Sequence, residues 1–105
     1  MLLPQGYRPP DVRLRAKRWR AFVKVRPDWP FTLDELHDLC QEYGVAVCCP
    51  VAVRTGAELI LASGGRLRAA ALAVHLTELA TERGGGWTFR LDNDHLGGCI
   101  LAERG

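Results

Sequence analysis

Long apolar runs are missing from this sequence. The longest extends only from Ala69 to Val74, whereas a membrane-spanning helix needs about 20 predominantly apolar residues. The first residues also lack the basic stretch followed by an apolar segment that marks a secretory signal. These absences predict a cytoplasmic protein with no membrane partner.

The residue spacings of metal and catalytic sites are also missing. Zinc sites usually show two ligands separated by two residues, twice over, and no such repeated pair occurs. No phosphate-binding loop and no glycine-flanked nucleophile turn is present, and the glycine run 84–86 follows a predicted helix instead of preceding one. The sequence therefore predicts no catalytic, cofactor-binding or metal-ligating residue, and it favours a protein that is not an enzyme.

Cysteine and histidine leave a weaker alternative open. In a reducing compartment the cysteines are expected to stay free thiols, and a small enzyme or metal protein using them with the histidines is the third interpretation of function. The segment 92–97 followed by Glu103 matches part of a calcium loop, although a turn rich in Asp, Asn and Gly explains the same letters. The cysteines and histidines of the enzyme or metal interpretation are Cys40, Cys48, Cys49, Cys99, His37, His75 and His95.

The composition is that of one ordinary globular domain. The chain has 105 residues, of which 48% are hydrophobic and 25% are charged. Its net charge is only +2, but residues 1–26 carry eight basic side chains and one acidic one, a net +7. Residues 27–105 carry six basic and eleven acidic side chains, a net −5. Such asymmetry indicates an acidic partner, either a protein surface or a nucleic acid.

Residues 1–17 are predicted to form an extended, proline-containing basic arm, and residues 18–105 a single α+β domain. The segment 18–26 alternates apolar and basic side chains, which predicts a strand with one basic face. The basic side chains of the arm are Arg8, Arg13, Arg15 and Lys17.

Two helices are predicted after this strand. Thr32 and Glu35 form a capping box at the start of the first, Phe31 and Leu36 form a hydrophobic staple, and Gly44 ends it. The second helix covers residues 66–83. It is apolar over more than half of its circumference, which predicts that it is covered on two sides. Its two apolar stripes are Leu67, Ala70, Ala71 and Val74, and Leu72, Leu76, Leu79 and Ala80.

The remaining strands complete a ferredoxin-like prediction. Pro50 cannot donate to a ladder, so its strand is expected at a sheet edge or with a bulge. The element order is then β-α-β-β-α-β, a two-layer sandwich with two helices on one face of an antiparallel sheet. The strands that follow the first are expected at 45–54, 57–62 and 86–92, with an optional last strand at 99–103.

The candidate site is the outward face of the first strand. On the predicted sheet its side chains share the open face with Arg90, and arginine suits charge-assisted bonds to carboxylates. The residues predicted to bind a partner are Arg18, Arg20, Phe22, Lys24, Arg26 and Arg90.

These features favour a small binding protein, a regulator or inhibitor that contacts a protein partner through this basic face. The alternative is nucleic-acid binding by the same face together with the arm, since an aromatic ring beside basic groups suits a stacked base and its phosphates. The surplus apolar surface of the second helix and the valine-rich edge strand also favour a homodimer, unless the arm or the last strand covers them.

Overall fold

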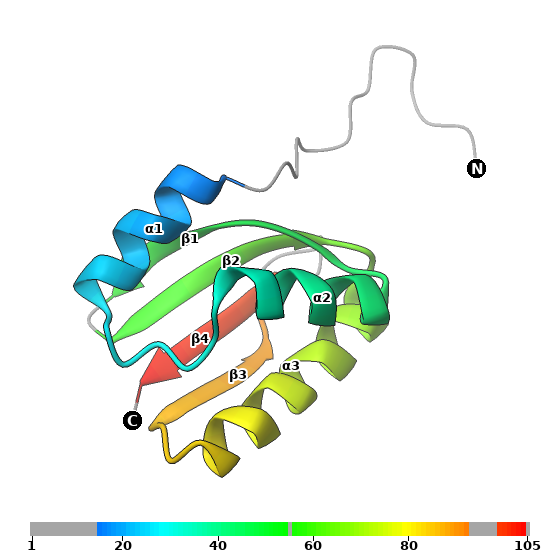
Figure 1. Cartoon of the computed structure of the whole chain (residues 1–105). Coiled ribbons are helices and arrows are strands. Elements are labelled where there is room, and N and C mark those ends of the chain that lie inside the picture. The colour runs from blue at the N-terminus through cyan, green and yellow to red at the C-terminus, as the bar shows by residue number, and fades with distance from the viewer. Residues whose placement is uncertain (1–14, 55, 93–98, 105) are drawn as a thin grey trace.

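The computed structural model describes residues 15–54, 56–92 and 99–104. These ranges form three helices and one four-stranded antiparallel sheet (Figure 1). None of these helices has the length and apolarity needed to cross a membrane. In chain order the elements are α1 (Ala16–Val25), α2 (Leu33–Tyr43), β1 (Ala46–Arg54), β2 (Ala57–Ser63), α3 (Arg66–Glu82), β3 (Trp87–Leu91) and β4 (Ile100–Arg104).

The basic strand predicted at residues 18–26 is wrong, because residues 18–25 lie in the helix α1 and Arg26 is its C-cap. In a strand, Trp19 and Phe22 would point to opposite faces, whereas residues three apart share one face of a helix. Both rings are buried, at 1% and 8% exposure, so only the helix removes both from water on the same side. Of the predicted arm, residues 1–14 lie outside the described residues, Arg15 precedes α1, and Lys17 belongs to α1.

The start and the end of α2 agree with the sequence prediction. The Thr32 hydroxyl accepts a hydrogen bond from the Glu35 amide, and the Glu35 carboxylate accepts one from the Thr32 amide, both at 3.1 Å. Phe31 and Leu36, the predicted staple, are both buried in the main core. Gly44 caps the C-terminus with a φ of 68°, a left-handed conformation that glycine adopts without strain.

The ferredoxin-like order is not confirmed. That order begins with a strand, whereas the described part of this chain begins with two helices and its sheet has the order β1-β2-β4-β3. The optional last strand exists as β4 and lies between β2 and β3, antiparallel to both. The coarser α+β prediction is confirmed, with three helices in place of two.

The three helices cover one face of the sheet, and all contribute to a single core. Alternate residues of the strands point into this core, as Ile60, Phe89 and Ile100 do. The opposite face carries a smaller apolar cluster built around Leu59 and Leu101. The four cysteines are buried free thiols.

Backbone groups of both edge strands, β1 and β3, form hydrogen bonds with a helix or with its side chains. On β1 the register shifts between Val47 and Pro50, so the predicted edge position and irregularity are both present. The Cys48 carbonyl in this irregular stretch accepts bonds from the Arg15 amide at 3.0 Å and from the Trp19 indole at 2.9 Å. On β3 the Thr77 hydroxyl of α3 accepts a bond from the Phe89 amide and donates one to the Phe89 carbonyl. Side chains and α1 therefore occupy edge groups that could otherwise pair with another strand.

Trp29, in the connection between α1 and α2, is the centre of the aromatic core. Its ring centroid lies 5.1–5.9 Å from those of five other rings. Most of these contacts are edge-to-face, the geometry that aromatic pairs prefer. The five rings are those of Trp19, Phe22, Phe31, Trp87 and Phe89.

Replacing Trp29 should cost more stability than replacing an exposed residue nearby. We expect Trp29→Ala to lower the free energy of unfolding by about 3–5 kcal/mol, because it opens a cavity among five rings. Equilibrium urea unfolding measures the loss. Val25→Ala, at a position that is 74% exposed, is the control and should change stability by less than about 0.5 kcal/mol. A loss below about 1 kcal/mol for Trp29→Ala would contradict the central role of this ring.

Candidate partner-binding surface

The solvent side of α1 carries basic residues and no acidic one. Lys17, Arg20 and Lys24 follow one another at intervals of three and four, which places them along one ridge of the helix. This ridge lies opposite the buried Trp19 and Phe22. Arg18 is also exposed, on the side of the helix between Lys17 and Phe22. We call Lys17, Arg18, Arg20 and Lys24 the basic face of α1.

Ion pairing separates this face from most of the other described arginines. The carboxylates of Asp28, Glu35, Glu58 and Glu103 bind arginines elsewhere on the molecule. The residues of the basic face make no ion pair with any residue in the described ranges. The arginines that do so are Arg26, Arg54, Arg83, Arg90 and Arg104. The cationic groups of α1 are therefore available to carboxylates from outside the described part of the chain.

An apolar groove adjoins the basic face. It is a cavity of about 480 Å³ between α1 and the segment that leads into α2. Arg20 and Val23 line it from α1, so one residue of the basic face also belongs to the groove. We call this cavity the α1 groove. Its lining residues are Trp19, Arg20, Val23, Trp29, Pro30, Phe31, Thr32 and Leu33.

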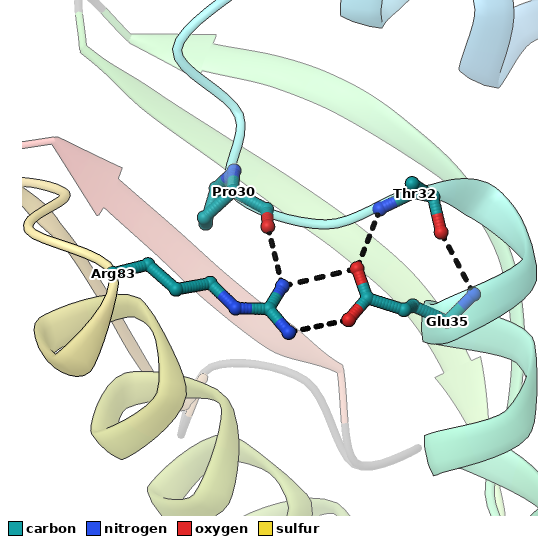
Figure 2. A network of polar contacts seen from close by, with 4 residues as sticks. All are labelled: Pro30, Thr32, Glu35 and Arg83. Atoms are coloured by element: carbon teal, nitrogen blue, oxygen red, sulfur yellow. Dashed lines mark hydrogen bonds and ion pairs between the residues drawn. The ribbon is translucent and has the colours of Figure 1, made fainter.

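Arg83, just after α3, fixes the segment that forms one side of the α1 groove (Figure 2). Its guanidinium donates to the Pro30 carbonyl at 2.7 Å and binds both carboxylate oxygens of Glu35. Its charged carbon also lies 5.3 Å from the centre of the Phe31 ring, within the range of a cation–π contact. The start of α2 and the groove residues before it are thus tied to the end of α3.

The pKa shifts of Glu35 and Arg83 agree with their ion pair. The hydrogen bond from Arg83 holds the pKa of Glu35 below its ordinary value of 4.5, and the Thr32 amide adds to the effect. The same contact with Glu35 raises the pKa of Arg83. Both groups therefore remain charged at neutral pH.

The structure brings together only part of the predicted site. Arg18, Arg20 and Lys24 do share the surface of one element, although it is a helix. Phe22 lies in the core at 8% exposure and points away from that surface. Arg26 is half-buried and bonds to the buried Glu58 at 3.2 Å.

Arg90 and the arm residues stand apart from this surface. Arg90 alternates with the buried Trp87 and Phe89, so it lies on the sheet face opposite the helices, where it bonds to Glu103 at 3.0 Å. The expected shared face of Arg90 and Arg20 is therefore wrong. Arg15 precedes α1 and its backbone bonds to β1, while Arg8 and Arg13 lie outside the described residues.

Sequence reasoning missed the α1 groove. Two of its lining residues, Trp29 and Phe31, lie on the connection between α1 and α2, which carries no periodic pattern, and Leu33 is the first residue of α2. The available signal was the pair of prolines, Pro27 and Pro30, on either side of Trp29. Prolines fix the backbone near a large ring, which is a common way to hold an aromatic residue in place within a loop.

The cysteines and histidines do not form a reactive cluster in the described part of the chain. Burial raises the pKa of the Cys40 thiol to about 12. Burial and the adjacent Cys49 raise that of Cys48, so both thiols are protonated and weakly nucleophilic at neutral pH. The Tyr43 hydroxyl and His75 Nδ1 lie 2.6 Å apart between α2 and α3. Within the described ranges no three His, Cys, Asp or Glu side chains come close enough to hold a metal ion. His95 and most of the proposed calcium loop lie outside those ranges.

Comparison with protein-family models, with curated proteins and with solved structures returns no match.

The ion pair between Arg83 and Glu35 predicts a pH dependence of stability. The pKa of Glu35 is lower in the folded state, so its stabilisation is present above the unfolded pKa and is lost as the pH falls through the folded pKa. Glu35→Gln should lower the midpoint of thermal unfolding at pH 7 by less than about 5 °C, because the pair is partly exposed. We expect the difference from the unmodified protein to shrink as the pH is lowered below 4.5.

Calorimetry between pH 3 and pH 7 measures this difference, and each buffer should be held at the same ionic strength. Glu42→Gln, on the same helix, is the control because Glu42 makes no ion pair with a described residue. A Glu35→Gln effect that is constant across the pH range would show that the ion pair does not contribute to folding.

Proposed function

We propose that this protein is a non-enzymatic binding protein that recognises an acidic segment of a protein partner. The basic face of α1 would bind the carboxylates, and the α1 groove would take an apolar side chain of the same segment. The observation that carries this proposal is the position of Arg20, which belongs to the basic face and also lines the apolar groove. A single partner segment can therefore contact both.

The combination fits the anatomy of protein interfaces. Binding energy at such interfaces is concentrated in a few apolar anchors that enter pockets, while charged pairs at the rim steer association. A cavity of about 480 Å³ falls within the size range of small-molecule and side-chain pockets. Three aromatic rings, those of Trp19, Trp29 and Phe31, line it. The basic face supplies the steering charges and the groove supplies the anchor site.

The mode of action that we propose is occlusion or bridging, the role of a regulator or inhibitor. The surface offers no pair of groups arranged for proton transfer or nucleophilic attack in the described residues. The groove is instead fixed by Arg83 and by the aromatic core. A rigid recognition surface favours binding because less conformational entropy is lost when the partner docks.

Nucleic acid is the competing partner, since a basic helix also suits a phosphate backbone. The sequence predicted that nucleic acid would bind to an open sheet face. Two residues of that face are not available, because Phe22 is buried and Arg90 is paired with Glu103. Base stacking on Phe22 would require the core to open. A phosphate-only contact would use Lys17, Arg20 and Lys24 and leave the apolar groove without a role, so we favour the acidic protein segment.

Reversing the charge of the ridge should abolish recognition of an acidic segment. The probe is a fluorescent peptide of about 15 residues that combines glutamates with leucine and phenylalanine at helical spacing. We expect Lys17→Glu/Arg20→Glu/Lys24→Glu to weaken its binding at least 100-fold, because three attractive contacts become repulsive. Fluorescence anisotropy measures the affinity.

Matched probes decide between the two partner classes. The charge-conserving variant Lys17→Arg/Lys24→Arg should bind the acidic peptide like the unmodified protein. A single-stranded oligonucleotide of similar charge should bind more weakly, and its affinity should fall more steeply with salt, by roughly one log unit per log unit of salt for each phosphate contacted. Tighter binding of the oligonucleotide than of the peptide would overturn the proposal in favour of nucleic acid.

The contribution of the groove can be separated from that of charge. Val23→Asp places a carboxylate at the groove, and we expect it to weaken peptide binding at least tenfold because the docking anchor would have to desolvate that charge. Val25→Asp makes the same change in charge on the same helix, at a residue that does not line the groove. Anisotropy titrations of both variants with the same peptide give the comparison. Equal losses in the two variants would show that the groove takes no part.

A further inference from the structure

A second exposed surface lies on α3, away from α1. The inner side of α3 is closed, since Leu72, Leu76 and Ala80 are each 0% exposed. On its outer side Leu67 is 88% exposed and Val74 is 58% exposed, with the exposed Ala71 between them. Helices that are apolar on both sides are usually covered on both sides. The described part of the chain covers only the inner side.

The charges of α3 run in an unfavourable order. Its first turn contains Arg66 and Arg68, and its last turns contain Glu78 and Glu82, with no acidic residue in the first turn and no basic one in the last. A helix prefers the opposite order, since its N-terminus carries a partial positive charge and its C-terminus a partial negative one. An antiparallel neighbour with the same charge order would relieve this at both ends.

We propose that the outer side of α3 pairs antiparallel with α3 of a second copy of this chain. The spacing of four and three along Leu67, Ala71, Val74 and Glu78 makes one stripe down the helix. In an antiparallel pair that places Ala71 opposite Val74 of the second copy, Glu78 of that copy faces Leu67 and neighbours Arg68, the next residue along, and the two-fold axis repeats the contact. Ala71 leaves room for the two helices to approach closely.

Self-complementary charge is what selects a second copy over another protein. A two-fold interface requires each surface to be complementary to itself, and α3 satisfies this requirement because one half is basic and the other acidic. Pairing through the sheet is less favourable, since Thr77 occupies backbone groups of β3, and α1 and Pro50 interrupt the edge of β1. The outer surface of α3 is therefore a better route to a symmetric dimer than either edge of the sheet.

Such a dimer goes beyond the proposed function, because it uses neither the basic face nor the α1 groove. The helix α1 contacts the edge strand β1, while α3 contacts β3 at the other edge. A dimer through α3 therefore leaves both α1 surfaces free, and a partner with two acidic segments would gain affinity by binding both.

The oligomeric state tests this proposal directly. A helix of 17 residues is about 25 Å long, and one helix pair is smaller than the interfaces of permanent dimers, which bury about 2,000 Å² or more. We therefore expect a reversible monomer–dimer equilibrium in sedimentation velocity, with dimer growing as concentration increases. Leu67→Glu should remove the dimer, whereas Val53→Glu, at an exposed position of β1, should not.

Charge reversal is the decisive experiment. Arg68→Glu and Glu78→Arg should each weaken the homodimer about tenfold, because each reverses two symmetry-related contacts. A mixture of the two variants should form a heterodimer more tightly than either forms a homodimer. Only in the mixture does the carboxylate introduced in one variant meet the guanidinium introduced in the other. Circular dichroism at low concentration verifies that each monomer is folded.

Three results would overturn the proposal. They are a monomer at every concentration, a dimer that survives Leu67→Glu, and a mixture of the charge variants that associates no better than the separate variants. The acidic-peptide titrations are carried out on monomeric protein. Absence of the dimer therefore leaves the proposed function standing, and absence of peptide binding leaves the dimer standing.

Discussion

The packing around Trp29 is the constraint on which the rest of the structure depends. Its ring touches aromatic residues from α1, from the segment just before α2 and from β3. These contacts join segments far apart in the sequence, so they fix the angle at which α1 lies on the sheet. The same contacts leave the α1 groove open on the solvent side of the cluster. The groove is therefore a consequence of how the core is built, and its shape is as rigid as that core.

The irregularity at Pro50 provides the second constraint. Proline cannot donate to the ladder, and the register of this edge strand shifts between Val47 and Pro50, the stretch that contains the Cys48 carbonyl. The Arg15 amide and the Trp19 indole bind this carbonyl and dock the start of α1 there. The irregular stretch of the edge strand thus holds the attachment point for the helix that carries the candidate site.

Local signals in the sequence predicted the elements that depend on local interactions. The capping box at Thr32, the helix at 66–83 and the edge position of Pro50 all follow from neighbouring residues. The segment 18–26 was predicted wrongly. Over so few residues the sequence fits both the alternating pattern of a strand and the helical spacing of Trp19 and Phe22. The choice depends on Trp29 and Cys48, which contact α1 only after folding. For the same reason the predicted site kept Arg18, Arg20 and Lys24 but lost Phe22, Arg26 and Arg90, whose positions depend on the tertiary structure.

The basic face of α1 is hard to explain by stability alone. Arg20 lies three residues from Lys17 and four from Lys24, so both spacings bring like charges together on the helix surface, at a cost of about 0.2–0.5 kcal/mol per pair. Lys17 and Arg18 also lie at the N-terminus of α1, where the helix dipole disfavours cations. Elsewhere the described chain neutralises Arg26, Arg83 and Arg104 with nearby carboxylates. Our proposal of an acidic partner rests on this departure beside the α1 groove, since such a partner would supply carboxylates that the described chain does not place there.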